Sequence, residues 1–188
     1  MISIFATYSI DIQHLHIIVK VRMKIKILFV CLGNICRSPA AEGVMQRLVD
    51  ERGLASCFEI DSAGTYSGHH GQLPDPRMRQ HASRRGYNLT HRARPIERAD
   101  FEHFSIIVAM DESNRRNLLH MASTIEQERK IVMMGDYIVK LRAHYDYVPD
   151  PYYEGAEGFE LALDLLEDAC SNLLDEIIEK NKKNIPQS

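Results

Sequence analysis

Residues 24–39 read Lys24-Ile25-Lys26-Ile27-Leu28-Phe29-Val30-Cys31-Leu32-Gly33-Asn34-Ile35-Cys36-Arg37-Ser38-Pro39. The uninterrupted apolar run from Leu28 to Val30 predicts a strand that is buried on both faces. Gly33 and Asn34 tolerate positive φ, so the backbone after the strand can curl tightly. Ser38 suits the N-cap of a following helix, and Pro39 suits its first helical position. The stretch therefore predicts a strand, a tight loop and a helix.

The predicted loop combines an anion site with a reactive thiol. Backbone N–H groups that point into one concavity at a helix N-terminus bind an oxyanion, preferably phosphate. Cys31 stands at the mouth of this loop, where the amide dipoles and Arg37 favour its thiolate form. Arg37 offers a planar fork of donors that fits two phosphoryl oxygens. Cys31 is therefore a candidate nucleophile, and Arg37 is a candidate group for binding phosphate and stabilising the transition state.

A chance Cys and Arg in an ordinary strand-to-helix turn is the alternative interpretation. Their spacing alone is weak evidence, but the preceding strand, the Gly-Asn pair and the Ser-Pro pair make the combination specific. The segment from Cys31 to Pro39 resembles the phosphate loop of the low-molecular-weight protein tyrosine phosphatases. Three more segments resemble that family in the same order: Asp61–Thr65, Met110–Asn114 and Asp150–Tyr153.

The resemblance extends over about residues 24–180. It implies hydrolysis of phosphotyrosine in protein substrates through a cysteinyl-phosphate intermediate, with no metal ion or other cofactor. It also implies that phosphate is bound by the loop residues Leu32, Gly33, Asn34, Ile35, Cys36 and Ser38.

A proton donor for the leaving oxygen is the next requirement of this chemistry. Asp150 lies in the segment Val148-Pro149-Asp150-Pro151, where the prolines disfavour a helix or an inner strand. It also matches the general acid of the family, which as a carboxylate activates water in the second half-reaction. The alternative is that Asp150 only initiates a turn.

Tyr152 and Tyr153 are predicted to line a deep slot that selects an aryl ester, with buried core tyrosines as the alternative. Family members often carry an aromatic residue on the opposite wall, a few positions after the Ser-Ala-Gly segment. This chain has Tyr66-Ser67-Gly68-His69-His70 there, so Tyr66 and His69 are the two candidates to replace it.

Supporting roles follow from the resemblance for Ser62 and His91, which would hold the phosphate loop in shape; surface caps are the alternative. Asp111 is either a helix N-cap or a buried acid near the loop, and we favour the cap with a minor supporting role.

In the family, a cysteine at the position of Cys36 can form a disulfide with the nucleophile, which would make the enzyme redox-sensitive. A small buried apolar residue is an equal alternative for Cys36.

The remaining sequence predicts an α/β domain. Strands are expected at residues 58–64, 105–110 and 130–134, with a loop over 65–73. Helices are expected over 39–51, from Asp75 as N-cap to Gly86, from Asp111 as cap to Leu119, and after Gly158. The last of these helices carries one apolar stripe, formed by Phe159, Ala162, Leu166, Ala169, Leu173 and Ile177. This alternation predicts a three-layer, doubly wound fold with a central four-stranded parallel sheet and helices on both faces. Cys31 would then lie at the carboxyl end of the first strand, where ligands bind in such sheets.

Length and composition fit a single phosphatase domain over residues 23–188, preceded by an extension of undetermined structure over residues 1–22. That extension lacks the pattern of a signal peptide and is too interrupted to span a membrane. A net charge of −3 gives no reason to expect nucleic acid or an anionic membrane as partner. Four cysteines in 188 residues indicate a reducing, cytoplasmic location. The protein is expected to be a monomer or a weak dimer.

Four alternatives to this function fit the sequence less well. Arsenate reductase on this fold relays oxidation through two further downstream cysteines, whereas Cys57 and Cys170 are far apart here. Protein arginine phosphatase carries a threonine where this chain has Ile35. A phosphoprotein-binding module would not need nucleophile, arginine and acid together. A metal site built from Cys31, Cys36, His69 and His70 lacks a common zinc spacing.

Overall fold

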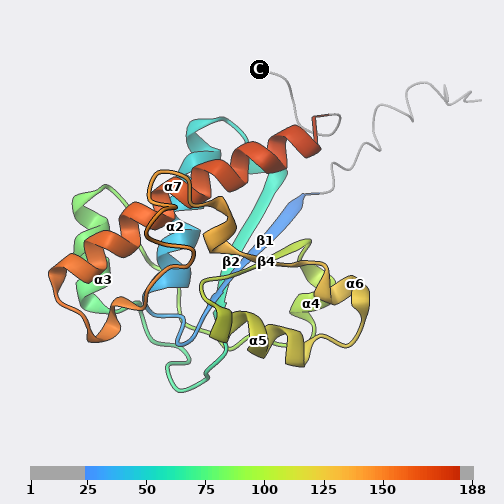
Figure 1. Cartoon of the computed structure of the whole chain (residues 1–188), viewed down its shortest axis with the longest axis horizontal. Helices are drawn as coiled ribbons and strands as arrows, with labels where there is room; N and C mark the ends of the chain where they lie inside the picture. Colours follow the sequence, from blue (N-terminus) through green and yellow to red (C-terminus); the bar gives the residue numbers. More distant parts are fainter. Residues whose placement is uncertain (1–23, 183–188) are drawn as a thin grey trace, which may run out of the picture.

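The computed structural model describes residues 24–182, so the extension predicted for residues 1–22 lies outside the described residues. One sheet of four parallel strands forms the centre of the molecule, in the order β2-β1-β3-β4 (Figure 1). The strands are β1 (Ile25–Cys31), β2 (Phe58–Gly64), β3 (Ile106–Ala109) and β4 (Ile131–Met133). The predicted four-stranded parallel sheet is therefore confirmed.

Helices cover both faces of the sheet, as predicted. Figure 1 shows α2 (Arg37–Glu51), α3 (Pro76–Arg84) and α7 (Ala156–Lys180) on one side. On the other side lie α4 (Asp100–His103), α5 (Glu112–Met121) and α6 (Ile125–Glu128). Three short 3-10 helices complete the described chain: η1 (Ala55–Cys57), η2 (Met134–Tyr137) and η3 (Pro151–Tyr153).

The central strand β1 is buried from both sides. Ile27 and Phe29 belong to the core under α2 and α7, whereas Leu28 and Val30 belong to the core under α4 and α5. The side chains of a strand alternate between the two faces of the sheet, so a strand is apolar at every position where helices cover both faces. This explains why the apolar run is continuous.

The register brings three loops to one edge of the sheet. Cys31 pairs with Gly64 at the end of β2, and Val30 pairs with Ala109 at the end of β3. The chain leaves β1 toward β2 on one side of the sheet and later enters β3 on the other side. The carboxyl end of β1 is thus the point where the winding direction changes, and Cys31 lies there.

Two predicted helix starts are wrong. α2 begins at Arg37, so Ser38 is not its N-cap and Pro39 occupies the third helical position. Proline is tolerated there because the N–H groups of the first helical turn have no partner within the helix. α7 begins at Ala156, before Gly158, whose added Cβ would lie 2.4 Å from the Cβ of Glu154. Gly158 therefore permits a close approach of the preceding loop and does not mark the helix start.

The other predicted boundaries agree with the structure. Asp75 caps α3 by accepting a hydrogen bond from the N–H of Arg77 at 2.8 Å, and Asp111 caps α5 by accepting one from the N–H of Asn114 at 2.7 Å. The residues predicted to form the apolar stripe of the last helix are all buried: Phe159, Ala162, Leu166, Ala169, Leu173 and Ile177. In the part of the chain that the structure describes, no helix combines the length and apolar character needed to cross a membrane.

Candidate active site

The predicted site residues meet in one pocket at the carboxyl end of β1. Its volume is about 200 Å³, and its lining comes from the phosphate loop, from the loop after β2 and from the segment before α7. The lining residues are Cys31, Leu32, Gly33, Ile35, Cys36, Arg37, Tyr66, His69, Asp150, Tyr152 and Tyr153. All three predicted catalytic residues and both candidates for the opposite wall are therefore in the same place.

The sulfur of Cys31 faces into the phosphate loop. The backbone N–H of Asn34 donates to its Sγ at 3.3 Å, and the hydroxyl of Ser38 lies 3.1 Å from the same atom. Cys31 is 2% exposed, so its few accessible atoms are those at the pocket. An amide N–H and a hydroxyl that point at sulfur stabilise negative charge on that atom.

Asn34 holds the loop in its curled shape. It is the one non-glycine residue with positive φ in the described chain, at 55°, as its place in the loop predicts. Its Nδ2 donates to the hydroxyls of Ser38 and Ser62, both at 2.9 Å. Its Oδ1 accepts from Nε2 of His91 at 3.0 Å and from the backbone N–H of Arg94 at 2.8 Å.

Ser62 and His91 are therefore placed against the loop, where the resemblance expected them. Arg94 was not predicted, because its contribution is a backbone N–H group that any residue other than proline supplies.

Gly33 departs from the expectation of positive φ. The positive-φ glycines of the described chain are Gly53, Gly71 and Gly86. A Cβ at Gly33 would instead lie 3.0 Å from Cδ2 of His69. The absence of a side chain at position 33 thus lets the imidazole of His69 pack directly on the phosphate loop.

Arg37 is buried and held by two acids. Its Nη1 donates to Oδ2 of Asp111 at 2.5 Å and to the backbone oxygen of Val148 at 3.1 Å, and its Nη2 donates to Oδ2 of Asp150 at 2.6 Å. Burial works against the charge, but the nearby Cys31, Asp150 and Asp111 outweigh it and raise the pKa of Arg37 above its usual value. Its Nε is buried and has no hydrogen-bond partner within residues 24–182, which leaves that donor for a ligand.

Asp111 combines the two roles that the sequence left open. It caps α5 through Oδ1 and binds Arg37 through Oδ2. An acid that is both a helix cap and a partner of the guanidinium fixes Arg37 relative to a helix on the far face of the sheet.

Asp150 lies at the start of η3, across the pocket from the phosphate loop. Its Oδ1 accepts from the N–H of Tyr152 at 3.2 Å, while Oδ2 accepts from Arg37. Tyr152 and Tyr153 are 36% and 92% exposed, and their rings meet edge to face at 4.9 Å. They are therefore wall and rim residues of the pocket, and the interpretation as core tyrosines is wrong.

Tyr66, one of the two candidates for the second aromatic wall, lines the pocket. It is 55% exposed, and its ring lies edge-on to the ring of His69 at 6.0 Å. A Cβ added to Gly68 would fall 2.3 Å from Cε1, Cζ and the hydroxyl oxygen of Tyr66. The ring of Tyr66 thus fills the space that a side chain at position 68 would take. Tyr66 can adopt this position because residue 68 is a glycine.

Cys36 is buried beside the nucleophile, and all four cysteines are free thiols. Burial, followed by the nearby charges of Asp75 and Cys31, raises the pKa of Cys36 well above its usual value. Cys36 is therefore held as a neutral thiol next to Cys31.

Among the described side chains, the pocket holds no cluster with metal-binding geometry. Among residues 24–182, the one group of three ligating side chains whose donor atoms lie within 4.8 Å of one another is Glu42, Asp61 and His91. Those acids already bind protein groups, since Ser62 donates to Glu42 at 2.6 Å and Arg94 donates to Asp61 at 2.8 Å. The alternative set of Cys31, Cys36, His69 and His70 does not converge in the described chain.

Comparison with known proteins adds independent findings. Residues 26–184 match the model of the family described as low molecular weight phosphotyrosine protein phosphatase. A Synechocystis protein, provisionally named a low molecular weight protein-tyrosine-phosphatase, is 50% identical over 149 residues, which cover 79% of this chain and 94% of the relative.

Solved structures of phosphatases are also similar to this chain in fold and sequence. The crystal structure of a protein tyrosine phosphatase from Entamoeba histolytica, with Hepes in its active site, has a TM-score of 0.81 and 44% identity, and the match covers 84% of this chain and 99% of that one. A Drosophila arginine phosphatase has a TM-score of 0.75 and 37% identity, and the match covers 81% of this chain and 97% of that one.

Proposed function

Because the chain belongs to the low molecular weight phosphotyrosine protein phosphatase family, we propose that Cys31, Arg37 and Asp150 carry out its protein tyrosine phosphatase reaction. The observation that carries this assignment is the orientation of Cys31. Its sulfur points into a loop of backbone amides, and the buried guanidinium of Arg37 and the carboxylate of Asp150 line the same pocket.

The first step transfers the phosphoryl group to sulfur. The thiolate of Cys31 attacks phosphorus, the bond between phosphorus and the tyrosine oxygen breaks, and Asp150 gives its proton to that oxygen. The loop amides and Arg37 stabilise the charge on the equatorial oxygens of the transition state. The Nε of Arg37, which has no partner among the described residues, is available for one of those oxygens.

The second step hydrolyses the cysteinyl phosphate. Asp150, now a carboxylate, takes a proton from a water molecule, whose oxygen attacks phosphorus while the bond between sulfur and phosphorus breaks. The products are inorganic phosphate and the Cys31 thiolate. The hydroxyl of Ser38, 3.1 Å from sulfur, stabilises that thiolate as it leaves.

The walls of the pocket support phosphotyrosine as the substrate. The rings of Tyr66 and Tyr152 flank a pocket whose floor is the phosphate loop, so an aryl ester can place its ring between them while its phosphate reaches the floor. A phosphoserine side chain is shorter and has no ring to pack against these walls. The substrates are therefore phosphotyrosine residues of proteins.

A substrate panel tests this proposal. We expect kcat/KM for phosphotyrosine peptides to exceed that for phosphoserine and phosphoarginine peptides, and no turnover of arsenate with thioredoxin. The phosphoarginine arm is needed because a Drosophila arginine phosphatase is 37% identical to this chain. Cys31→Ser should abolish turnover without unfolding the protein. A preference for phosphoarginine, or activity that survives Cys31→Ser, would contradict the proposal.

The proposal also extends to location and regulation. A nucleophilic thiol must stay reduced, so a cytoplasmic location fits the four free cysteines. We expect a monomer or weak dimer in sedimentation experiments.

We expect Cys36 to protect Cys31 from irreversible oxidation by forming a disulfide with it. If Cys36→Ser recovers from peroxide as fully as the wild type when dithiothreitol is added, this protective role is wrong.

A further inference from the structure

The N-terminus of α3 is tied to the phosphate loop through Asp75. The backbone N–H of Asp75 donates to the backbone oxygen of Ile35 at 2.7 Å. The Asp75 carboxylate, which is buried, accepts from Nε of Arg77 at 3.0 Å and from Nη2 of Arg77 at 2.8 Å. This two-point contact with a buried acid fixes the plane of the Arg77 guanidinium.

The same guanidinium holds the segment that carries the general acid. Its Nη2 donates to the backbone oxygen of Tyr152 at 3.0 Å, and its Cζ lies 5.4 Å from the centre of the Tyr152 ring. Its Cζ also lies 4.8 Å from the centre of the Phe159 ring in α7. Arg77 thus binds both the backbone and the ring of Tyr152, whose N–H donates in turn to Asp150.

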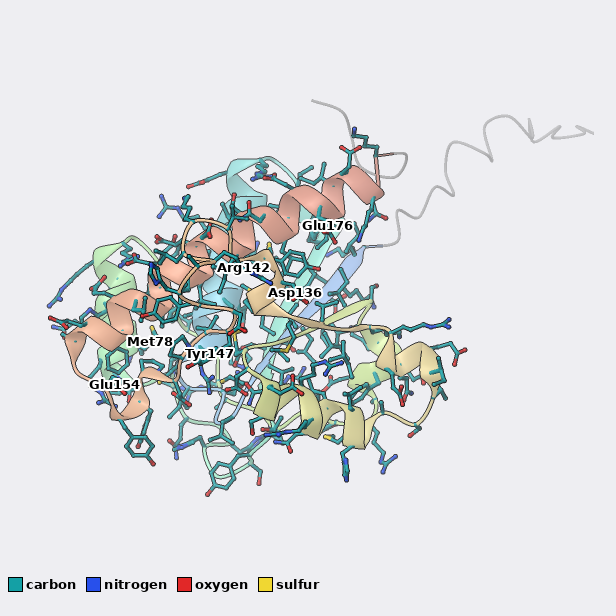
Figure 2. The ribbon with its side chains drawn as sticks, in the orientation of Figure 1. Met78, Asp136, Arg142, Tyr147, Glu154 and Glu176 are labelled. Carbon is teal, nitrogen blue, oxygen red and sulfur yellow. The ribbon has the colours of Figure 1, made fainter. Side chains whose placement is uncertain are left out.

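The acid segment has little regular structure of its own to hold it in place. Between the end of η2 at Tyr137 and the start of α7 at Ala156, η3 is the one helix or strand. Figure 2 labels Glu154 in this segment and Met78, the residue next to Arg77, on α3. Met78 is fully buried and α3 packs on α7, so Arg77 projects from a rigid support.

We propose that Arg77 is a positioning residue for the general acid. It holds residues 150–153 against the phosphate loop through the chain of contacts Ile35–Asp75–Arg77–Tyr152, so that the carboxyl group of Asp150 stays within reach of the leaving oxygen. This inference rests on the proposed function. A displacement of about 1 Å in a reacting group is enough to cost up to about a hundredfold in rate, whereas the thiolate and Arg37 would be unaffected.

Leaving-group dependence is the measurement that isolates this role. We expect kcat/KM of the wild type to vary little across aryl phosphates with leaving groups of increasing pKa, because Asp150 protonates the leaving oxygen. In Arg77→Ala, kcat/KM should fall about tenfold for phenyl phosphate and much less for nitrophenyl phosphate, whose leaving group needs no proton. Arg77→Lys should not restore the wild-type dependence, since an ammonium group lacks the planar fork.

Two controls separate positioning from stability. Arg79→Ala removes the same charge from an exposed position on α3, where no hydrogen bond or ion pair within residues 24–182 involves its side chain, and it should behave like the wild type. If Arg77→Ala does not fold, Arg77→Met replaces it, because methionine retains the aliphatic part of the side chain. Arg77→Met should show the leaving-group dependence expected for Arg77→Ala. A uniform loss for all substrates in these Arg77 variants would overturn the proposal.

A double-mutant cycle decides whether Arg77 acts through Asp150. In an Asp150→Ala background, Arg77→Ala should cause no further loss that depends on the leaving group. Fully additive losses would overturn the proposal. A wild-type enzyme that hydrolyses no aryl phosphate would instead overturn the proposed function, whereas dependence on Asp150 but not on Arg77 would overturn this inference alone.

Discussion

Asn34 combines a positive φ of 55° with four side-chain hydrogen bonds, so one residue fixes both the curl of the phosphate loop and its attachment to the surrounding structure. The backbone conformation and the hydrogen bonds are separable by mutation. Glycine adopts positive φ at no steric cost but offers no side chain, whereas alanine lacks both advantages.

We predict that Asn34→Gly and Asn34→Ala both lower kcat/KM for aryl phosphates by about a hundredfold, because the loop amides no longer converge on the phosphate. Steady-state kinetics, with circular dichroism to check folding, measure this. Activity of Asn34→Gly close to the wild type would mean that the backbone conformation alone shapes the loop.

The residues that we propose for the chemistry could be singled out from the sequence, because their side-chain types and spacing are themselves the requirement, and the structure brings them into one pocket. Cys31, Arg37 and Asp150 are of this kind. The position of the Tyr66 ring could not be derived, since it depends on how the loop after β2 folds over Gly68. Only the N-cap role of Ser38 was predicted wrongly, because its hydroxyl bonds with the Cys31 sulfur and with Asn34 and not with the helix end.

The N-terminus of α3 carries a charge-dependent contribution to stability. The hydrogen bond from the Arg77 side chain is the main reason why the pKa of Asp75 is lowered from its ordinary value of 3.8, and backbone N–H groups add to it. The charged form of Asp75 is therefore favoured by folding. Its contribution is complete above the unfolded-state value and is lost as the pH falls through the lower folded-state value.

We predict that Asp75→Asn destabilises the protein by about 1 kcal/mol at neutral pH, and by less at a pH below 3.8. Asparagine still caps the helix, so the difference reports the charged contact with Arg77. Urea unfolding of both proteins at several pH values measures it. A difference that stays constant with pH would contradict this assignment.

Elements with a continuous apolar pattern or a distinct cap could be predicted, as β1, β3, the caps of α3 and α5 and the stripe of α7 show. The short elements α4, α6 and the 3-10 helices were not, because three or four residues are too few to display a period. The start of α2 was placed too late, since the phosphate loop leads into the helix directly at Arg37 without a capping side chain.

The whole molecule brings Asp150 to the pocket by a long connection that leaves β4 and returns over the end of the sheet. Val148 donates its N–H to the backbone oxygen of Met110, which closes this return beside the end of β3. Figure 2 labels Asp136, Arg142 and Tyr147, which with Asp111 line a second cavity of about 650 Å³ along the connection. At Gly135 the connection packs so closely that an added Cβ would lie 1.6 Å from the backbone oxygen of Asp146.

We therefore predict that Gly135→Ala destabilises the protein by about 3 kcal/mol, because backbone on both sides must move to admit the methyl group. Thermal unfolding measures the change. Gly155→Ala is the matched control, because nothing lies within 4 Å of an added Cβ there, and it should cost about 1 kcal/mol or less. Equal effects of the two substitutions would mean that the contact with Asp146 is not a constraint.

The central claim is that the sulfur of Cys31 accepts the phosphoryl group. Rapid acid quenching of Asp150→Ala during turnover of nitrophenyl phosphate, followed by peptide mass spectrometry, tests it most directly, because this variant hydrolyses the intermediate slowly. We predict one added phosphoryl group on the peptide that contains Cys31, located by fragmentation on that cysteine. A phosphoryl group on Cys36 or Ser38, or none at all during turnover, would contradict the account.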